Sequence, residues 1–227
     1  MERLLNLLTD AQKIRLMLYS FYGKDAQDAL NFIMAATPEM QSINQGLRSG
    51  SNPADLMDGV YFCLKNGATI LYTGQTEMEN VDHIGIIMGG MAFGVQLRDK
   101  GEFALYKDYE KCPKQADYYT SQNGRSCHED FDCIKATERI KKIGTDIPLM
   151  DSEYIPCIRH WDIMGMFKSQ LQAALKAAGG DVIAEDDWYW SASEYSQGHA
   201  WVVYFSNGGT NLYYKSGSTR VRAVVAF

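Results

Sequence analysis

The sequence predicts an α+β domain of short antiparallel strands with two helices, preceded by an N-terminal helical segment. Two stretches, residues 1–36 and 162–178, place apolar side chains at helical spacing. Elsewhere, short runs rich in β-branched and aromatic residues alternate with Gly, Asn and Ser, as in antiparallel sheets. The 227-residue chain has no internal repeat and has room for one large domain with a helical appendage.

The first segment, residues 1–50, is predicted to be helical. Its apolar residues follow alternating steps of three and four, which is the spacing of a coiled-coil seam. They are Leu4, Leu7, Ala11, Ile14, Leu18 and Phe21. Fewer than three heptads are present, so an amphipathic helix packed on its own domain explains the spacing equally well. We expect the segment to serve attachment or assembly into a homo-oligomer.

Residues 49–53 (SGSNP) form the best candidate linker, and the second domain covers residues 51–227. Its first strands are predicted at residues 60–64, 68–72, 83–88, 91–97 and 103–106. Asn66-Gly67 and Gly89-Gly90 are predicted to be two-residue hairpin turns, because such dipeptides favour the left-handed backbone that these turns need.

An irregular polar stretch at residues 107–130 leads into the two predicted helices of this domain. The first covers residues 134–143, and the second covers residues 162–178 and ends at Gly179-Gly180. The apolar face of the second helix consists of Met164, Phe167, Leu171, Ala174 and Ala178. The final strands are predicted at residues 200–205, 210–215 and 220–227.

Composition and charge limit the possible partners. The chain is 46% hydrophobic and 22% charged with a net charge of −6, so we expect no nucleic-acid partner. No apolar run approaches the roughly 18 residues that span a bilayer, so we expect no membrane insertion. The first residues do not form a secretory signal peptide. We therefore expect a protein that stays inside a cell or leaves it by another route, such as assembly into a phage particle.

The cysteines are odd in number and lack a CxxC spacing, which favours buried free thiols over a disulfide framework or a thiolate metal site. They are Cys63, Cys112, Cys127, Cys133 and Cys157. One bridge among Cys112, Cys127 and Cys133 is left open as an alternative, because the segment around them is polar and loop-like.

Residues 188–227 combine ten aromatic side chains with six serines, four glycines and two asparagines. Their only charged residues are Glu194, Lys215, Arg220 and Arg222. Tyr and Trp give large contact areas at small entropic cost, while Ser, Gly and Asn supply adaptable hydrogen bonds, as in antibody paratopes. The composition predicts a recognition surface, with an ordinary β-rich core as the alternative.

Side-chain alternation predicts which residues of these strands face a ligand. In the strand at residues 201–205, odd-numbered residues share one face and even-numbered residues share the other. We expect the odd-numbered face to be buried and Val202 and Tyr204 to lie on the ligand side. Tyr213 and Tyr214 are adjacent and point in opposite directions, so at least one of them is expected to face solvent.

Several motifs in the second half of the chain occur in a characteristic order. They are YIP at 154–156, AAGG at 177–180, WYWSASEYS at 188–196, AW at 200–201, FSNG at 205–208 and RVRAV at 220–224. Together they resemble the variable proteins of diversity-generating retroelements, of the gut-bacterial and phage kind. The resemblance is specific over residues 150–227, looser over 58–107, and does not extend to residues 1–50.

This resemblance implies a C-type-lectin-like fold and a retroelement that rewrites adenine-containing codons, here within residues 188–227. It implies a structural frame of Trp188, Trp190, Trp201, Phe205, Gly208, Arg220, Val221 and Arg222. It implies ligand-binding, rewritten positions among Ser196, Gln197, Gly198, His199, Val202, Tyr204, Gly209, Asn211, Leu212, Tyr213, Tyr214, Ser216, Gly217, Ser218 and Thr219. Two of the frame residues, Arg220 and Arg222, are expected to tie the last strand to neighbouring carbonyls or carboxylates.

The resemblance also implies a function and a location. It indicates a receptor-binding tip of a phage tail or a bacterial surface adhesin, with a cell-surface protein or glycan as ligand. A structural phage-particle protein with a lectin-like assembly domain is the alternative. Formylglycine-generating enzymes share the fold, but they need a cysteine pair near the C-terminal part of the site, and no cysteine follows Cys157.

No motif of catalysis or cofactor binding is present, so we expect no enzyme activity, no cofactor and no metal. Cys157 and His160 have the spacing of half a metal site or of a nucleophile and base, but without further ligands a packed pair is favoured. The acidic run at residues 128–132 lacks the ligand spacing of a calcium loop. The calcium-binding triplets of sugar-binding lectins and the P-loop, GxSxG and HExxH motifs are absent.

Overall fold

The computed structural model describes residues 56–119 and 126–227. The predicted helical segment at residues 1–50 and the candidate linker at 49–53 lie outside the described residues, and both stay predictions. The described part is a mixed α/β fold dominated by one large sheet, which confirms the prediction of helices combined with antiparallel strands.

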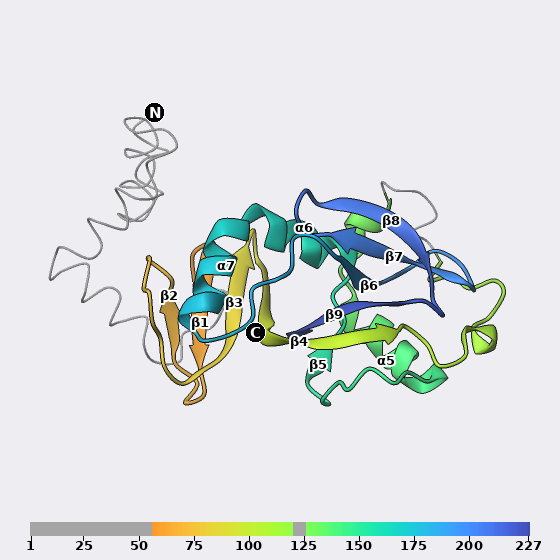
Figure 1. Cartoon of the computed structure of the whole chain (residues 1–227), viewed down its shortest axis with the longest axis horizontal. Helices are drawn as coiled ribbons and strands as arrows, with labels where there is room; N and C mark the ends of the chain where they lie inside the picture. Colours follow the sequence, from red (N-terminus) through yellow and green to blue (C-terminus); the bar gives the residue numbers. More distant parts are fainter. Residues whose placement is uncertain (1–55, 120–125) are drawn as a thin grey trace, which may run out of the picture. The chain divides into compact units, whose positions relative to one another are not determined.

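One sheet of nine strands organises the described residues (Figure 1). Its strands are β1 (Gly59–Leu64), β2 (Thr69–Leu71), β3 (Val81–Met88), β4 (Met91–Ala104), β5 (Glu153–Tyr154), β6 (Trp188–Glu194), β7 (His199–Tyr204), β8 (Gly209–Tyr214) and β9 (Ser218–Val225). The strand order is β2-β1-β3-β4-β9-β6-β7-β8, and β5 pairs with β9. Strand β9 is parallel to β6 and antiparallel to β4, so the last strand of the chain joins the early strands to the late ones.

Helices pack against the strands on both sides of β9 in the sheet order. They are the 3-10 helices η3 (Tyr109–Lys111) and η4 (Ser126–Glu129) and the α-helices α5 (Cys133–Ile143), α6 (Ile158–Met166) and α7 (Lys168–Ala177). Helix α7 contacts β1 and β3, while α5 and α6 contact β6 (Figure 1). The predicted helix at residues 134–143 is confirmed as α5, one residue longer at its start.

The prediction of one helix over residues 162–178 is wrong. Two helices, α6 and α7, meet at Phe167, whose φ of −104° and ψ of 18° end the first and begin the second. The apolar spacing runs across the break because both helices face the same core. The predicted end is confirmed, since the Gly180 N–H donates to the Leu175 carbonyl and the Gly179 N–H donates to that of Lys176.

The first hairpin has the predicted strands but a longer turn. Cys63 pairs with Thr69, and the Leu64 N–H donates to the Ala68 carbonyl at 2.8 Å, which leaves a loop of three residues rather than two. Gly67 has a φ of +82° and closes this loop in the left-handed conformation. The Asn-Gly dipeptide therefore sits one position later in the turn than the sequence predicted.

The second hairpin confirms the predicted glycine turn. Met88 pairs with Met91, and Gly89 and Gly90 both have positive φ, as a tight two-residue turn requires. The separate strand predicted at residues 103–106 is wrong, because β4 continues without interruption to Ala104. Its register against β9 shifts twice between Val95 and Gly101, so irregular pairing bends one long strand instead of ending it.

Aromatic side chains from α6, β6 and β7 form the centre of the core. Trp161, Trp190 and Phe205 are buried, and the Trp161 indole N–H donates to the Trp190 carbonyl at 3.2 Å. Trp161 also contacts the Tyr189 ring at a centroid distance of 5.1 Å. Trp201 is buried as well. The prediction that the odd-numbered face of the strand at 201–205 is buried is confirmed.

Arg222 fixes β9 in the middle of the sheet. Its guanidinium is fully buried, pairs with the Asp99 carboxylate at 2.6 Å and donates to the carbonyls of Gln96 and Asp181. Arg220 pairs with Asp187 at 2.7 Å. The prediction that these arginines tie the last strand to carbonyls and carboxylates is confirmed.

The cysteines are all free and buried, so the open alternative of a bridge among Cys112, Cys127 and Cys133 is wrong. Cys157 and His160 do not reach solvent. The His160 ring stacks on Phe131 with its centroid 4.0 Å away, and burial lowers the pKa of His160 from 6.5 to about 3. Burial also raises the pKa of the Cys157 thiol. The pair is packed, as expected, and a neutral thiol without solvent access is a poor nucleophile.

Replacing Arg222 by Leu should lower the free energy of unfolding by about 3–5 kcal/mol, because Asp99 would keep a buried charge without its main partner. Arg220→Leu is the matched control on the same face of the same strand. It should cost no more than about 1 kcal/mol, because that pair is partly solvent-exposed. Urea unfolding of both variants measures the difference, and equal losses would contradict the assigned role of Arg222.

His160 should make the fold sensitive to acid. Below pH 6.5 the unfolded chain binds a proton that the folded chain excludes until about pH 3, so stability falls as pH falls. His160→Phe keeps an aromatic ring and removes this titration. Between pH 7 and pH 5 the stability difference should shift by about 2 kcal/mol in favour of the variant. Parallel curves of unfolding free energy against pH would show that His160 is not buried as a neutral ring.

Candidate recognition surface

Strands β7 and β8 form one end of the sheet, and β8 is its edge strand. Their register pairs Val202 with Asn211 and Ala200 with Tyr213, so these four side chains lie on one face. His199 pairs with Tyr214 on the opposite face. The predicted ligand-binding residues are therefore distributed over both faces and the edge of the same two strands.

Thirteen of the fifteen predicted ligand-binding residues are at least partly accessible. The exposed ones are Asn211, Tyr213, Tyr214, Ser216 and Ser218. The half-buried ones are Ser196, Gln197, Gly198, His199, Tyr204, Gly209, Leu212 and Gly217. Tyr213 and Tyr214 keep 40% and 63% of their surface exposed, so both adjacent tyrosines face solvent where at least one was expected. We call these thirteen residues the recognition surface.

Two predicted contact residues are buried instead. Val202 is 3% exposed and Thr219 is 6% exposed, and the Thr219 hydroxyl donates to the Trp188 carbonyl. Val202 does share the predicted face with Tyr204, but Trp190 and Asn211 are its partners on the two neighbouring strands. A residue in the middle of a strand that has a paired strand on each side is covered by its cross-strand neighbours. This holds even where strand alternation points its side chain away from the main core.

Two further predicted contact residues have structural roles in this fold. The Gln197 amide donates to the carbonyls of Glu110 and Cys112, at 3.2 and 2.8 Å, and so holds the loop around η3. At Gly217 a Cβ would lie 2.5 Å from the Tyr213 ring, so any side chain there would displace that ring. Both residues belong to the recognition surface and also hold its local structure.

A hollow of about 290 Å³ lies on the face that carries Tyr213. It is lined by Asp187, Trp188, Val202, Asn211, Leu212, Tyr213, Ser218 and Thr219. Trp188, which the sequence placed in the frame, is only half-buried, and its ring lies 5.3 Å from that of Tyr204. Trp188 is therefore an accessible part of the surface rather than a purely structural residue.

The other face presents a smaller aromatic group. The His199 and Tyr214 rings have centroids 4.4 Å apart, and the Ser196 hydroxyl lies 3.4 Å from His199 Nδ1. Imidazole, phenol and hydroxyl groups can each donate or accept hydrogen bonds. This group can therefore adapt to a polar ligand without a fixed charge of its own.

A buried ion pair lies directly beneath the recognition surface. Lys215 is 0% exposed although both of its neighbours in the chain are exposed, and its ammonium group pairs with the buried Glu194 carboxylate. Glu194 also accepts hydrogen bonds from the Arg139 guanidinium at 2.8 Å and from the Tyr106 hydroxyl at 2.9 Å. Burial, followed by the charge of Glu194, raises the pKa of Tyr106.

Sequence reasoning noted Glu194 and Lys215 as charges in an aromatic-rich stretch but did not pair them. Buried charges need partners, so two opposite charges in such a stretch are themselves a signal of an internal ion pair. Their partner Arg139 comes from α5, 55 residues before Glu194, and nothing in the local sequence indicates that contact.

Residues of the acidic run at 128–132 bind other side chains and backbone groups of the protein. The His128 ring pairs with the Asp162 carboxylate at 2.8 Å, and Asp132 accepts from the Lys135 N–H at the start of α5. Among the residues that the structure describes, no group of three or more His, Cys, Asp or Glu side chains could hold a metal ion. The expectation that no metal binds stays a prediction.

No helix in the described part of the chain has the length and hydropathy needed to cross a membrane.

No protein-family model and no curated protein matches the sequence. A similar solved structure is a fimbrial protein from Bacteroides ovatus, 13% identical, with a TM-score of 0.45. The match covers 76% of this chain and 49% of the fimbrial protein, so the chain spans about half the length of that protein.

Proposed function

We propose that this chain is a ligand-binding protein that recognises a protein or glycan on a cell surface through the recognition surface. In this proposal it is the variable protein of a diversity-generating retroelement, with a C-type-lectin-like fold. It acts as a receptor-binding tip of a phage tail or as a bacterial surface adhesin, and binding requires no cofactor and no catalytic step.

The proposal rests on the contrast in exposure between Lys215 and its neighbours along the chain. Tyr213, Tyr214 and Ser216 are exposed, while Lys215 between them is fully buried and ion-paired. Exposed side chains that few other residues depend on tolerate substitution, and buried paired charges do not. Such a segment can change its contacts with a ligand while the backbone beneath them keeps its position.

The exposed residue types support recognition over plain solvation. Tyr, Asn, Ser and His offer aromatic area together with hydrogen-bond donors and acceptors, and here strands rather than mobile loops carry many of them. A surface that is already ordered loses less conformational entropy on binding, which raises affinity for a given contact area. The hollow beside Tyr213 adds a concave site for one protruding group of a ligand.

The genomic neighbourhood tests the retroelement part of the proposal. We expect a reverse-transcriptase gene nearby and an imperfect repeat of the 3′ end of this gene. Differences between the two copies should fall at codons of the recognition surface and spare those of Trp190, Glu194 and Arg222. A locus without either element would favour a structural particle protein that uses this domain for assembly.

Replacing Asn211, Tyr213 and Tyr214 together by Ala should abolish binding and cost no more than about 1.5 kcal/mol of stability, because all three are exposed. Binding of the full chain to a glycan array and to intact bacterial cells provides the first readout. Thermal unfolding of the same samples provides the second.

Trp201→Ala is the control for that experiment, since loss of a buried indole should cost about 3–5 kcal/mol. If the triple variant is destabilised as much as the Trp201 variant, these tyrosines are core residues and the proposed surface does not exist. If it stays folded and still binds every target of the parent protein, recognition lies elsewhere.

Lys215→Met should cost about 3–5 kcal/mol, because it leaves Glu194 buried without its ammonium partner. Adding Glu194→Gln should restore part of that stability, since the remaining group is then neutral. A double-mutant cycle in urea measures the coupling. Additive effects of the two substitutions would show that the pair does not support the surface.

A further inference from the structure

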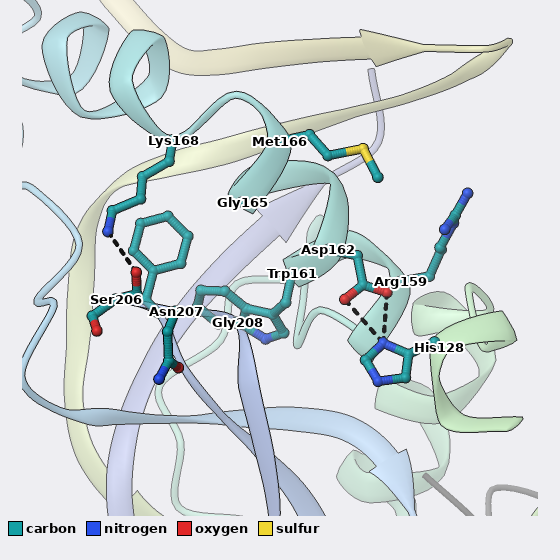
Figure 2. Close-up of a pocket in the computed structure, with 11 residues that line it drawn as sticks. His128, Arg159, Trp161, Asp162, Gly165, Met166, Lys168, Ser206, Asn207 and Gly208 are labelled. Carbon is teal, nitrogen blue, oxygen red and sulfur yellow. Dashed lines mark hydrogen bonds and ion pairs between the residues drawn. The ribbon is translucent and has the colours of Figure 1, made fainter. Parts of the chain in front are cut away.

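Two hollows of the described part of the chain differ in how their polar side chains are arranged. The larger measures about 500 Å³ and opens between α6, the start of α7 and the turn that joins β7 to β8 (Figure 2). Its Lys168 ammonium is already paired with Glu185 at 2.7 Å. The Arg159 side chain points away from this hollow, and Asn207 lies at the opposite end (Figure 2). The basic groups of the larger hollow therefore do not point at one shared position.

The smaller hollow, beside Tyr213, has its lining held together over a short span. It measures about 290 Å³. The Tyr213 ring lies so close to Gly217 that a Cβ there would be 2.5 Å from it. The Thr219 hydroxyl donates to the Trp188 carbonyl. Ser218, which lies between Gly217 and Thr219 in the chain, is thereby held close to both aromatic residues.

The pairing of β6, β7 and β8 places the other lining residues on the same face. Val202 pairs with Trp190 on β6 and with Asn211 on β8, so it lies between them. Asn211 and Tyr213 are two positions apart on β8 and share this face, with their Cα atoms roughly 7 Å apart. Pockets for drug-sized ligands measure roughly 300–1,000 Å³, so a hollow just below that range admits one ring-sized group.

The smaller hollow offers no unpaired charge to a ligand. Its lining residues include no Lys, Arg or His, and their only carboxylate belongs to Asp187. That carboxylate pairs with Arg220 at 2.7 Å and accepts from the Trp188 N–H at 2.8 Å. A cationic ligand would have to compete with Arg220, and an anionic ligand would be repelled by Asp187. We therefore expect an uncharged ligand.

Three uncharged polar groups of the lining have no hydrogen-bond partner within residues 56–119 and 126–227. They are the Tyr213 hydroxyl, the Ser218 hydroxyl and the Asn211 side-chain NH₂ group. Asn211 Oδ1 already accepts from the Leu212 N–H at 2.8 Å, so the amide keeps its donor side for a ligand. The hydroxyl groups can donate and accept. A purely apolar ligand would take water from these groups without replacing its hydrogen bonds, which weakens binding.

The remaining lining is apolar and aromatic. Val202 is buried, Trp188 is half-buried, and the Trp188 ring lies 5.3 Å from that of Tyr204. The face of an aromatic ring carries negative potential and attracts the weakly positive C–H groups of a ligand. A pyranose has C–H groups on the faces of its ring and hydroxyl groups around its edge, so it matches both parts of this lining.

We propose that the hollow beside Tyr213 binds one uncharged hexopyranose unit of a glycan. This inference rests on the proposed function and narrows its ligand from a protein or glycan to a glycan. The C–H face of the sugar packs on Trp188 and on the apolar base at Val202. The side chains of Tyr213, Ser218 and Asn211 bind its hydroxyl groups.

The test is an NMR titration of the ¹⁵N-labelled full-length protein with the methyl glycosides of glucose, galactose, mannose and N-acetylglucosamine. At least one of them should shift the signals of Trp188, Asn211 and Ser218 in a saturable way. Cyclohexanol keeps a ring but only one hydroxyl, and glucuronate adds a negative charge near Asp187. Each should bind at least about tenfold more weakly than the best glycoside.

Matched hydroxyl deletions locate the site. Tyr213→Phe removes one hydrogen-bonding group and should weaken glycoside binding by about three- to tenfold. Ser218→Ala, at an exposed position, should weaken it by a similar factor. Tyr214→Phe removes the same hydroxyl from the adjacent residue, on the opposite face of β8, and should bind like the parent. Thermal unfolding of each variant checks that the fold is kept.

Three results would overturn the proposal. Absence of saturable shifts with all four glycosides would show that the hollow binds no hexose. Equal binding of cyclohexanol would show a simple apolar hollow. Equal weakening by Tyr213→Phe and Tyr214→Phe would place sugar binding elsewhere.

Binding of the full chain to intact bacterial cells, before and after periodate oxidation of their glycans, separates this test from that of the proposed function. We expect oxidation to abolish binding. Binding that survives oxidation would overturn the sugar and leave the recognition surface in place. Saturable glycoside binding without binding to any cell would uphold the sugar site and contradict the proposed function.

Discussion

The buried carboxylate of Glu194 connects four parts of this fold. It lies at the end of β6 and binds Lys215 between β8 and β9, Arg139 on α5 and Tyr106 beyond β4. Removing these charges from water costs several kcal/mol per ion, and such a cluster persists only when hydrogen bonds satisfy it. These contacts hold the backbone beneath the recognition surface in place. The exposed side chains of that surface take no part in them.

Strand β9 extends that constraint through the sheet. It pairs with β4, β5 and β6, and its Arg222 side chain binds Asp99 together with two backbone carbonyls. The last strand of the chain therefore completes a sheet that the earlier strands cannot close by themselves. Because the pairing of β9 with β4 joins residues distant in sequence, it carries a larger loop-closure cost than the local hairpins of β6, β7 and β8.

Buried charges and exposed aromatic side chains lie next to each other at this end of the sheet. The recognition surface is carried mainly by β7 and β8, and the Lys215–Glu194 pair holds the backbone at the point where β8 ends. The side chains of Tyr213, Tyr214 and Ser216 take no part in that pair, so changes at these residues need not disturb it.

The sequence by itself determined the features that depend on neighbouring residues. These are the turn at Gly89-Gly90, the end of α7 at Gly179-Gly180, the buried face that contains Trp201 and the exposure of at least one of Tyr213 and Tyr214. Tertiary structure decided the break at Phe167, the burial of Val202 and the partners of Glu194. Periodicity reports which side of an element is apolar, but it cannot report which distant element covers that side, because that depends on contacts between residues far apart in the chain.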